Sequence, residues 1–167
     1  MTGPSYQDTE PGAGIAPRLY QVTRRDLVRY AGASGDFNPI HWNERTAKSV
    51  GLPDVIAHGM FTMALAGRFL TEWAGDPGAV TELGVRFSAP VVVPDDDKGA
   101  QVEVAGTVTG KLDGDRVTVG VTARSGDAKV LTRAQAVVRL RAVLAQGDDP
   151  LEPPAVLAQG DDPLEPP

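Results

Sequence analysis

The sequence contains no cysteine, which excludes disulfide bonds and metal sites built on thiolates. Aromatic residues make up only 5% of the chain, and no apolar run approaches the roughly 20 residues that span a bilayer. The N-terminus, MTGPSYQDTEPGAG, lacks the basic and apolar regions of a secretory signal. We therefore expect a cytoplasmic protein that does not insert into membranes.

Excess positive charge is absent as well. The net charge is −6, from 16 Lys and Arg against 22 Asp and Glu. All 16 cations and 16 of the acids lie in residues 1–141, so this part of the chain is neutral. The remaining acids follow residue 141. Because no basic run or patch is visible, we expect no nucleic acid as a partner.

Composition divides the chain into three segments. Residues 1–16 are rich in Gly and Pro and have no hydrophobic period, which predicts a flexible arm. Residues 17–141 carry the periodic patterns and have the length of one domain. Residues 142–167 are an acidic, Pro-rich tail in which AVLAQGDDPLEPP occurs twice in tandem, and this composition predicts disorder. The origin of the duplication stays open.

The first half of the domain is predicted to be mainly helical. A helix over about 24–33 should end at the turn Ser34-Gly35-Asp36, and a shorter one should cover 44–50. Asn38-Pro39 is typical of an N-cap followed by Pro at the first helical position. Residues 60–74 are apolar nearly all round, as in a helix that is enclosed by protein.

Beyond residue 80 the hydrophobic period changes to two, which predicts four strands with one apolar face each. Asp113-Gly114 is a hairpin signal, Gly126-Asp127 is a weaker one, and a further short strand is expected at Leu19–Val22. An antiparallel sheet must cover its apolar face, and the apolar helix at 60–74 is the available cover. The pattern thus predicts an α+β domain with one sheet packed on one helix.

The most informative residues lie at the junctions of these helices. Asp36 and His41 stand five residues apart around a turn, and Gly59 opens the apolar helix. A carboxylate, an imidazole and an unobstructed backbone N–H are the groups needed to move a proton beside a thioester carbonyl. The only two histidines, His41 and His58, both belong to this set.

In these residues the chain resembles the MaoC family of R-specific enoyl-thioester hydratases and (3R)-hydroxyacyl-thioester dehydratases. The shared motif stands here as Ser34-Gly35-Asp36-Phe37-Asn38-Pro39-Ile40-His41, Gly51-Leu52 and His58-Gly59-Met60. The resemblance covers about residues 18–141. It implies a single hot-dog fold, in which a curved antiparallel sheet wraps around a long central helix. It is strongest toward catalytic subunits of mycobacterial dehydratases that pair with a silent hot-dog subunit.

The resemblance implies that Asp36 and His41 are the catalytic pair and that the N–H of Gly59 is the oxyanion donor. His41 would act as the base at C2, and Asp36 would handle the proton of the 3-hydroxyl or of water, although the division of the two protons stays open. Three residues are assigned supporting roles: Ser34, Asn38 and His58. Some family members place a helper serine where this chain has Gly67.

We expect no metal and no cofactor. Asp36, His41 and His58 would suit zinc by residue type, but their spacing does not favour it. No phosphate-binding loop or dinucleotide motif is present. The predicted activity is reversible dehydration of (3R)-hydroxyacyl thioesters, carried by acyl carrier protein or coenzyme A, in fatty-acid metabolism. The alternatives are a non-catalytic acyl-binding subunit of a heterodimer and a hot-dog thioesterase. A homodimer or heterodimer with a second hot-dog subunit is expected.

Overall fold

The computed structural model describes residues 3–142, so the predicted tail lies outside the described residues except for its first residue. One antiparallel sheet of five strands dominates the fold, in the order β1-β3-β4-β5-β2. The strands are β1 (Gly14–Val22), β2 (Val80–Phe87), β3 (Ala100–Leu112), β4 (Arg116–Ser125) and β5 (Ala128–Arg139). The hairpin predicted at Asp113-Gly114 joins β3 to β4.

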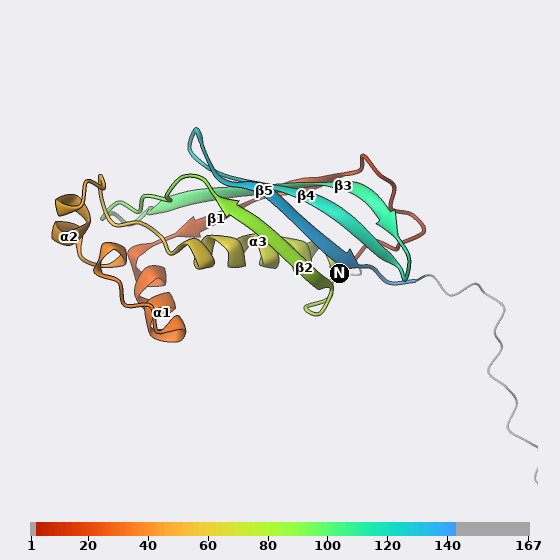
Figure 1. Cartoon of the computed structure of the whole chain (residues 1–167), viewed down its shortest axis with the longest axis horizontal. Helices are drawn as coiled ribbons and strands as arrows, with labels where there is room; N and C mark the ends of the chain where they lie inside the picture. Colours follow the sequence, from red (N-terminus) through yellow and green to blue (C-terminus); the bar gives the residue numbers. More distant parts are fainter. Residues whose placement is uncertain (1–2, 143–167) are drawn as a thin grey trace, which may run out of the picture.

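Helix α3 (Gly59–Ala74) runs along one face of the sheet, while α1 (Arg24–Ser34) and α2 (Glu44–Ser49) gather at one end (Figure 1). A 3₁₀ turn, η1 (Pro39–His41), connects the two short helices. This arrangement confirms the α+β hot-dog fold. None of the helices in residues 3–142 has the length and apolarity that crossing a bilayer requires.

The core lies between α3 and the sheet. Phe69 and Leu70 of α3 are almost fully buried, and they belong to one cluster with the inward valines of the strands. Gly106 of β3 allows this close packing, because a Cβ there would lie 3.1 Å from the ring of Phe69. Burial of each such side chain contributes roughly 1.5–3 kcal/mol, so the helix holds its position under the sheet.

The ends of α1 follow local sequence signals. The Asp26 carboxylate accepts hydrogen bonds from the Thr23 backbone N–H (2.9 Å) and hydroxyl (2.6 Å), which satisfies groups at the helix start. Gly35 ends the helix in the left-handed region, with φ 75°, and its N–H donates to the Ala31 carbonyl. This sharp end directs the chain into the loop that carries Asp36.

The N-terminal segment is more closely packed than the flexible arm that its composition predicts. Ser5 is only 2% exposed, and the Tyr6 N–H donates to the Arg141 carbonyl. Strand β1 begins at Gly14 rather than at the predicted Leu19, with a register irregularity between Ile15 and Arg18. Pro17 lies within that irregularity, and proline is tolerated in strands at such interruptions. The interruption conceals the period of two in the sequence.

Candidate active site

The turn that carries His41 is shaped by its own polar side chains. Asn38 precedes η1, and its side-chain oxygen accepts the N–H of Ile40 at 3.3 Å, while Pro39 occupies the first position of the turn. His41, the last residue of η1, is 7% exposed. The local sequence thus delivers an imidazole from a short, capped turn into the protein interior.

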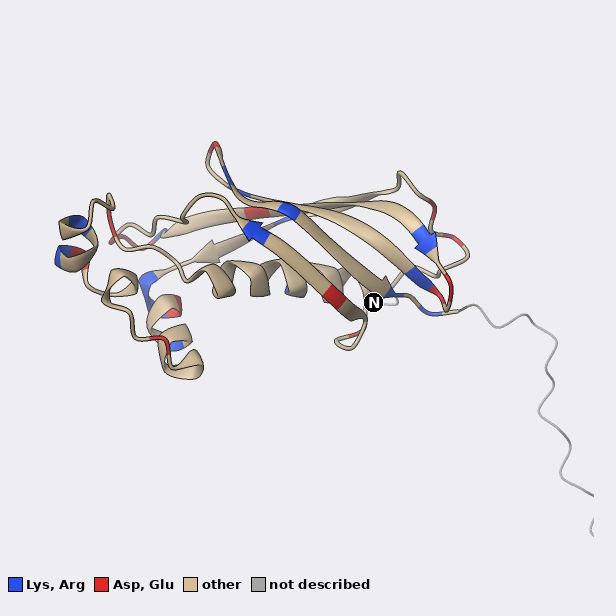
Figure 2. Ribbon diagram, viewed as in Figure 1, with Lys and Arg blue, Asp and Glu red and all other residues tan. Residues whose placement is uncertain are grey.

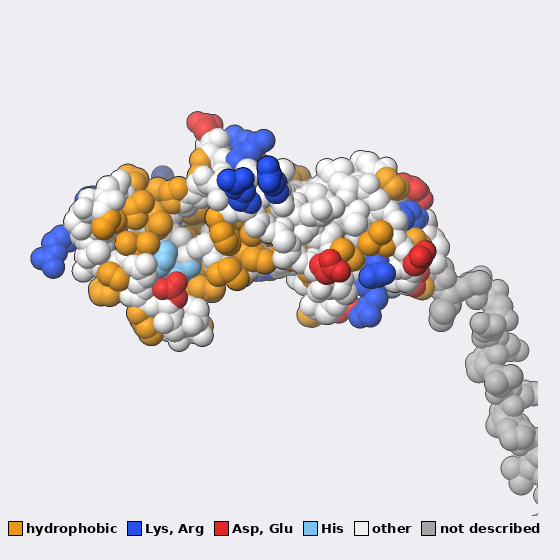
Figure 3. Space-filling model, in the orientation of Figure 1, with side chains coloured by type: hydrophobic (Ala, Val, Ile, Leu, Met, Phe, Trp, Pro, Cys, Tyr) orange, Lys and Arg blue, Asp and Glu red, His pale blue; other side chains and the backbone are white. Residues whose placement is uncertain are grey.

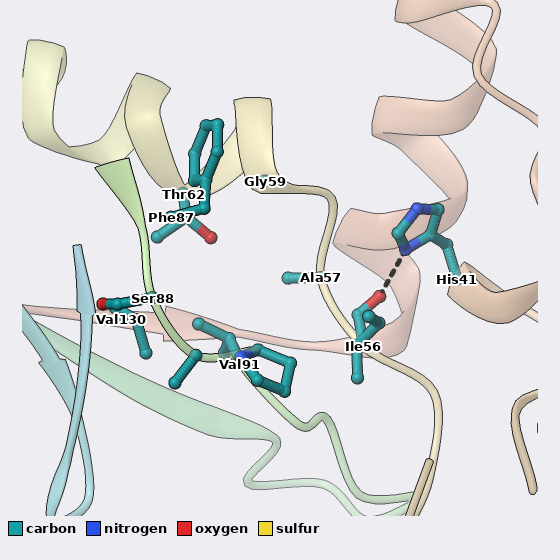
Figure 4. A pocket seen from close by; sticks show the side chains of 11 residues that line it. His41, Ile56, Ala57, Gly59, Thr62, Phe87, Ser88, Val91 and Val130 are labelled. Carbon is teal, nitrogen blue, oxygen red and sulfur yellow. Dashed lines mark hydrogen bonds between the residues drawn. The ribbon is translucent and has the colours of Figure 1, made fainter. Parts of the chain in front are cut away.

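The tautomer of His41 follows from its partner. Its Nδ1 lies 2.7 Å from the carbonyl oxygen of Ile56, as drawn in Figure 4. Because a carbonyl can only accept, Nδ1 carries the proton, and Nε2 of the neutral ring keeps a free lone pair. Burial lowers the pKa of His41 below its ordinary 6.5, and the nearby His58 acts in the same direction; the bond to Ile56 and the charge of Asp36 oppose them. The ring is therefore neutral at pH 7.

His58 lies directly against His41. The two rings are stacked with centroids 3.7 Å apart, and His58 is only 2% exposed. Its Nε2 lies 3.1 Å from the carbonyl oxygen of Asp36, so this nitrogen is the donor. Its Nδ1 is buried without a hydrogen-bond partner in the described part of the chain. His58 thereby ties the Asp36 loop to the start of α3.

Asp36 occupies an exposed loop whose shape depends on neighbouring side chains. The Ser34 hydroxyl donates to the Tyr30 carbonyl at 2.7 Å and accepts the N–H of Asp36 at 3.2 Å. An Asp36 carboxylate oxygen accepts the N–H of Asn38 at 3.1 Å. One polar atom each of Asp36, His41 and His58 lies within 4.8 Å of the others. The structure brings these predicted site residues together.

Gly59 begins α3, as the sequence predicts, and His58 precedes it without a side-chain capping bond. The N–H groups of a first helical turn lack partners within the helix, and the helix dipole makes this end favourable for negative charge. A Cβ at Gly59 would lie 3.3 Å from two atoms of the Phe87 ring. Glycine thus keeps this helix start accessible and allows β2 to approach it.

His41 and Gly59 line the same pocket, which has a volume of about 330 Å³. Figure 4 shows that its wall comes from η1, the loop before α3, α3 itself and the end of β2. The lining is mostly apolar and consists of His41, Ile56, Ala57, Gly59, Thr62, Phe87, Ser88, Ala89, Pro90, Val91 and Val130. Asp36 and His58 stand beside the pocket and are absent from its lining.

Sequence reasoning missed most of the pocket wall. Thr62 is a buried polar residue four positions after His58. Because it is a polar residue inside an apolar helix, the sequence offered a signal that it could belong to a site. Ser88, Ala89 and Pro90 continue the alternation of the sequence, although β2 itself ends at Phe87, so the pattern did not mark them as pocket residues. Val130 lies far along the chain and reaches the pocket only because β5 pairs with β2. No local pattern distinguishes it from the other inward valines.

The geometry offers little for a metal ion. His41 Nδ1 and His58 Nε2 face backbone carbonyls, which leaves only one nitrogen free on each ring. The rings are stacked with an angle of 24° between them, so their free nitrogens lie in nearly parallel planes. A zinc ion needs ligand atoms that converge at roughly 2.0–2.2 Å. The absence of a metal therefore stays our prediction.

Comparison with solved structures identifies the class of fold. A structure named MaoC-like dehydratase aligns with a TM-score of 0.78 and 45% identity, over 83% of this chain and 43% of that one. The (R)-hydratase from A. caviae involved in PHA biosynthesis aligns with a TM-score of 0.71 and 26% identity, over 81% and 99%. The fold is therefore the hot-dog fold of the MaoC hydratases and dehydratases.

The family follows from the sequence comparisons. The model of the family "MaoC like domain" matches residues 8–127, so the chain belongs to this family. The (R)-specific enoyl-CoA hydratase of Rhodospirillum rubrum is 30% identical over 138 residues, 82% of this chain and 92% of that protein. The 3-hydroxyacyl-thioester dehydratase X of Mycobacterium tuberculosis is 45% identical over 76 residues, 46% of this chain but only 26% of that protein.

Proposed function

We propose that this protein is a hydro-lyase that reversibly dehydrates (3R)-hydroxyacyl thioesters to trans-2-enoyl thioesters. One observation carries the proposal: the imidazole of His41 and the first turn of α3 face the same apolar pocket. A base and an oxyanion donor on either side of a space for an acyl chain suit proton abstraction next to a thioester carbonyl. The names of the aligned hydratases and dehydratases agree with this activity.

The proposed dehydration begins at C2. Nε2 of His41 takes the C2 proton, and the electron pair moves toward the thioester carbonyl. The Gly59 N–H donates to the oxygen as negative charge develops there, a contact worth about 3 kcal/mol of transition-state stabilisation. The electrons then return to form the C2–C3 double bond while the 3-hydroxyl leaves as water with a proton from the protonated carboxyl group of Asp36, and the proton that His41 took then returns to Asp36. Hydration runs through the same steps in reverse.

A second subunit is part of the proposal. Strands β1 and β2 are the edges of the sheet, and an edge strand presents unpaired backbone groups. Large apolar side chains are exposed around the site, namely Phe37 (62%), Trp42 (49%), Met60 (57%) and Phe87 (48%). Orange side chains accordingly surround the pale blue histidines in Figure 3. A second hot-dog subunit, identical or not, would cover this surface and enclose the acyl chain.

The test is hydration of crotonyl-CoA by the full-length protein, followed by the loss of enoyl absorbance. We expect His41→Ala and Asp36→Asn each to reduce kcat/KM at least 100-fold, as loss of an acid–base group does. Unchanged turnover in both variants would contradict the mechanism. Release of free thiol would identify a thioesterase instead. If the protein is a non-catalytic subunit, turnover would be seen only after a partner subunit is added, and neither substitution would change it.

A further inference from the structure

Cationic side chains gather on the solvent face of the sheet near the pocket. Figure 2 marks Lys and Arg in blue on β2 and β5, and Figure 3 shows such side chains side by side over these strands. Arg86 of β2 and Lys129 and Arg133 of β5 are all exposed. In residues 3–142, none of these three side chains makes an ion pair or hydrogen bond. Asp127 in the adjacent hairpin and Glu82 of β2 are the nearby acids by sequence and register.

The backbone at Arg133 is irregular. Gly84 pairs with Gln135 and Arg86 with Thr132, so β5 contains one residue more than β2 between these pairs. Arg133 occupies this bulge with φ +47°, a left-handed conformation that is unfavourable for residues other than Gly, Asn and Asp. Bulges redirect side chains and occur next to active sites. The bulge places Arg133 on the exposed surface of β5, the strand that pairs with β2, which contains Arg86.

This strand pair also forms part of the pocket wall. Phe87 follows Arg86 directly, and Val130 follows Lys129; both line the pocket. Ser88, another lining residue, donates its hydroxyl to the Lys129 carbonyl at 2.7 Å and its N–H to the Val130 carbonyl at 3.1 Å. At about 3.3 Å per residue along a strand, Arg86 lies within roughly 7 Å of Ser88 along β2. Arg86 and Lys129 thus directly precede residues of the pocket wall, whereas Arg133 stands further along β5 on the same solvent face, where it lines a hollow with Glu82.

We propose that Arg86, Lys129 and Arg133 bind the phosphate groups of the carrier that delivers the acyl thioester. This inference rests on the proposed function and extends it to the carrier. The pocket lining contains no Lys or Arg, so nothing inside it recognises an anionic carrier. Guanidinium groups fit phosphate bidentately, and ammonium groups add charge. Coenzyme A and the phosphopantetheine arm of a carrier protein both offer such a phosphate beyond the thioester.

The experiment uses one acyl group on three carriers. The crotonyl thioesters of pantetheine, of 4′-phosphopantetheine and of coenzyme A are hydrated by the full-length protein and by Arg86→Gln and Arg133→Gln. For each variant we expect KM to rise about tenfold with the phosphorylated carriers, in line with loss of a charge-assisted hydrogen bond, while kcat stays the same. The pantetheine thioester, which has no phosphate, should be unaffected. Equal effects on all three carriers, or none, would overturn the proposal.

The controls separate charge from backbone strain. Arg133→Lys retains the charge, so KM for the phosphorylated carriers should stay close to that of the parent protein. Arg133→Gly relieves the positive φ but removes the charge, so KM for these carriers should still rise. Arg139→Gln removes an exposed cation at the far end of β5 and should leave every KM unchanged. If Arg133→Gly behaves like the parent protein, the charge has no role. A rise in KM with both phosphorylated carriers would show that the cations bind the phosphate that the two carriers share. A rise confined to coenzyme A would show that they bind the phosphates of its nucleotide.

A binding measurement keeps this proposal separate from the catalytic one. Calorimetric titration of free coenzyme A into the His41→Ala protein needs no turnover. We expect binding there and about tenfold weaker binding when Arg133→Gln is added. If no crotonyl thioester is hydrated but this loss of affinity is seen, the catalytic proposal fails and the phosphate site stands. If hydration is seen but Arg133→Gln does not change the affinity for coenzyme A, the phosphate-site proposal is contradicted while the catalytic proposal stands.

Discussion

The imidazole rings of His41 and His58 are stacked with their centroids 3.7 Å apart and an angle of 24° between them. Both rings are buried, and each donates one N–H to a backbone carbonyl, of Ile56 and Asp36 respectively. Two positive charges at this distance would repel strongly in a buried site. The stack therefore helps to keep His41 in the neutral form that a base requires, while it fixes the ring next to the Asp36 loop.

The pH dependence of turnover tests this relationship. Since the pKa of His41 is lowered, kcat/KM should fall only when the pH drops below 6.5, as the base becomes protonated. His58→Phe retains an aromatic ring and removes the imidazole that contributes to the lowered pKa of His41, so the acid limb should move to higher pH. The measurement is a pH–rate profile with crotonyl-CoA for both proteins. An acid limb that moves to lower pH, or does not move, would contradict the proposal that His58 lowers the pKa of His41.

Stability should depend on the same group. A histidine whose pKa is lower in the folded state stabilises the protein fully above its unfolded pKa of about 6.5, and this contribution is lost as the pH falls from there through the folded pKa. His41→Asn should remove this part of the pH dependence. Urea unfolding of the parent and variant between pH 5 and about pH 8 checks it. Parallel curves over this range would contradict the assignment.

Gly59→Ala should reduce turnover more than stability. Its Cβ would lie 3.3 Å from the Phe87 ring, so either the ring or the helix start must shift at the oxyanion site. We expect kcat to fall about 100-fold if the donor is misplaced. Gly32→Ala is the matched control, because Gly32 lies in α1 with open space around its Cβ position. That variant should retain full activity and gain about 0.5–1 kcal/mol of stability.

Arg24 connects segments around the site. Its guanidinium lies 2.6 Å from Asp54 and 3.1 Å from Glu44, and its Nε donates to the Val93 carbonyl. Val93 in turn donates its N–H to Val55, next to the Ile56 carbonyl that orients His41. Because these groups are partly buried, Arg24→Ala should cost about 1–3 kcal/mol in urea unfolding.

Arg68→Ala provides the comparison for Arg24. Arg68 pairs with Glu72 on the exposed side of α3 at 2.7 Å, and its side chain is 64% exposed. Loss of this pair should cost less than about 1 kcal/mol. Equal costs for the two variants would show that the Arg24 network is no stronger than a surface pair.

Much of this protein was determined by local sequence. A hydrophobic period of two indicated the strands, and a stretch that is apolar nearly all round indicated the enclosed helix. Cap residues such as Asn38 and Gly35 indicated the turns around Asp36 and His41. These features depend on neighbours a few residues away, so they can be predicted from the order of residues. The motif also indicated which side chains belong to one site.

Tertiary structure decided what surrounds those side chains. Val130 and Phe87 reach the pocket through the register of β5 on β2, the bulge at Arg133 arises from that same pairing, and the stack of His41 on His58 joins two separate turns. The N-terminal segment gains its order from the strand ends beside it. Each of these contacts depends on the closure of long loops and on strand register, which alternation alone does not fix.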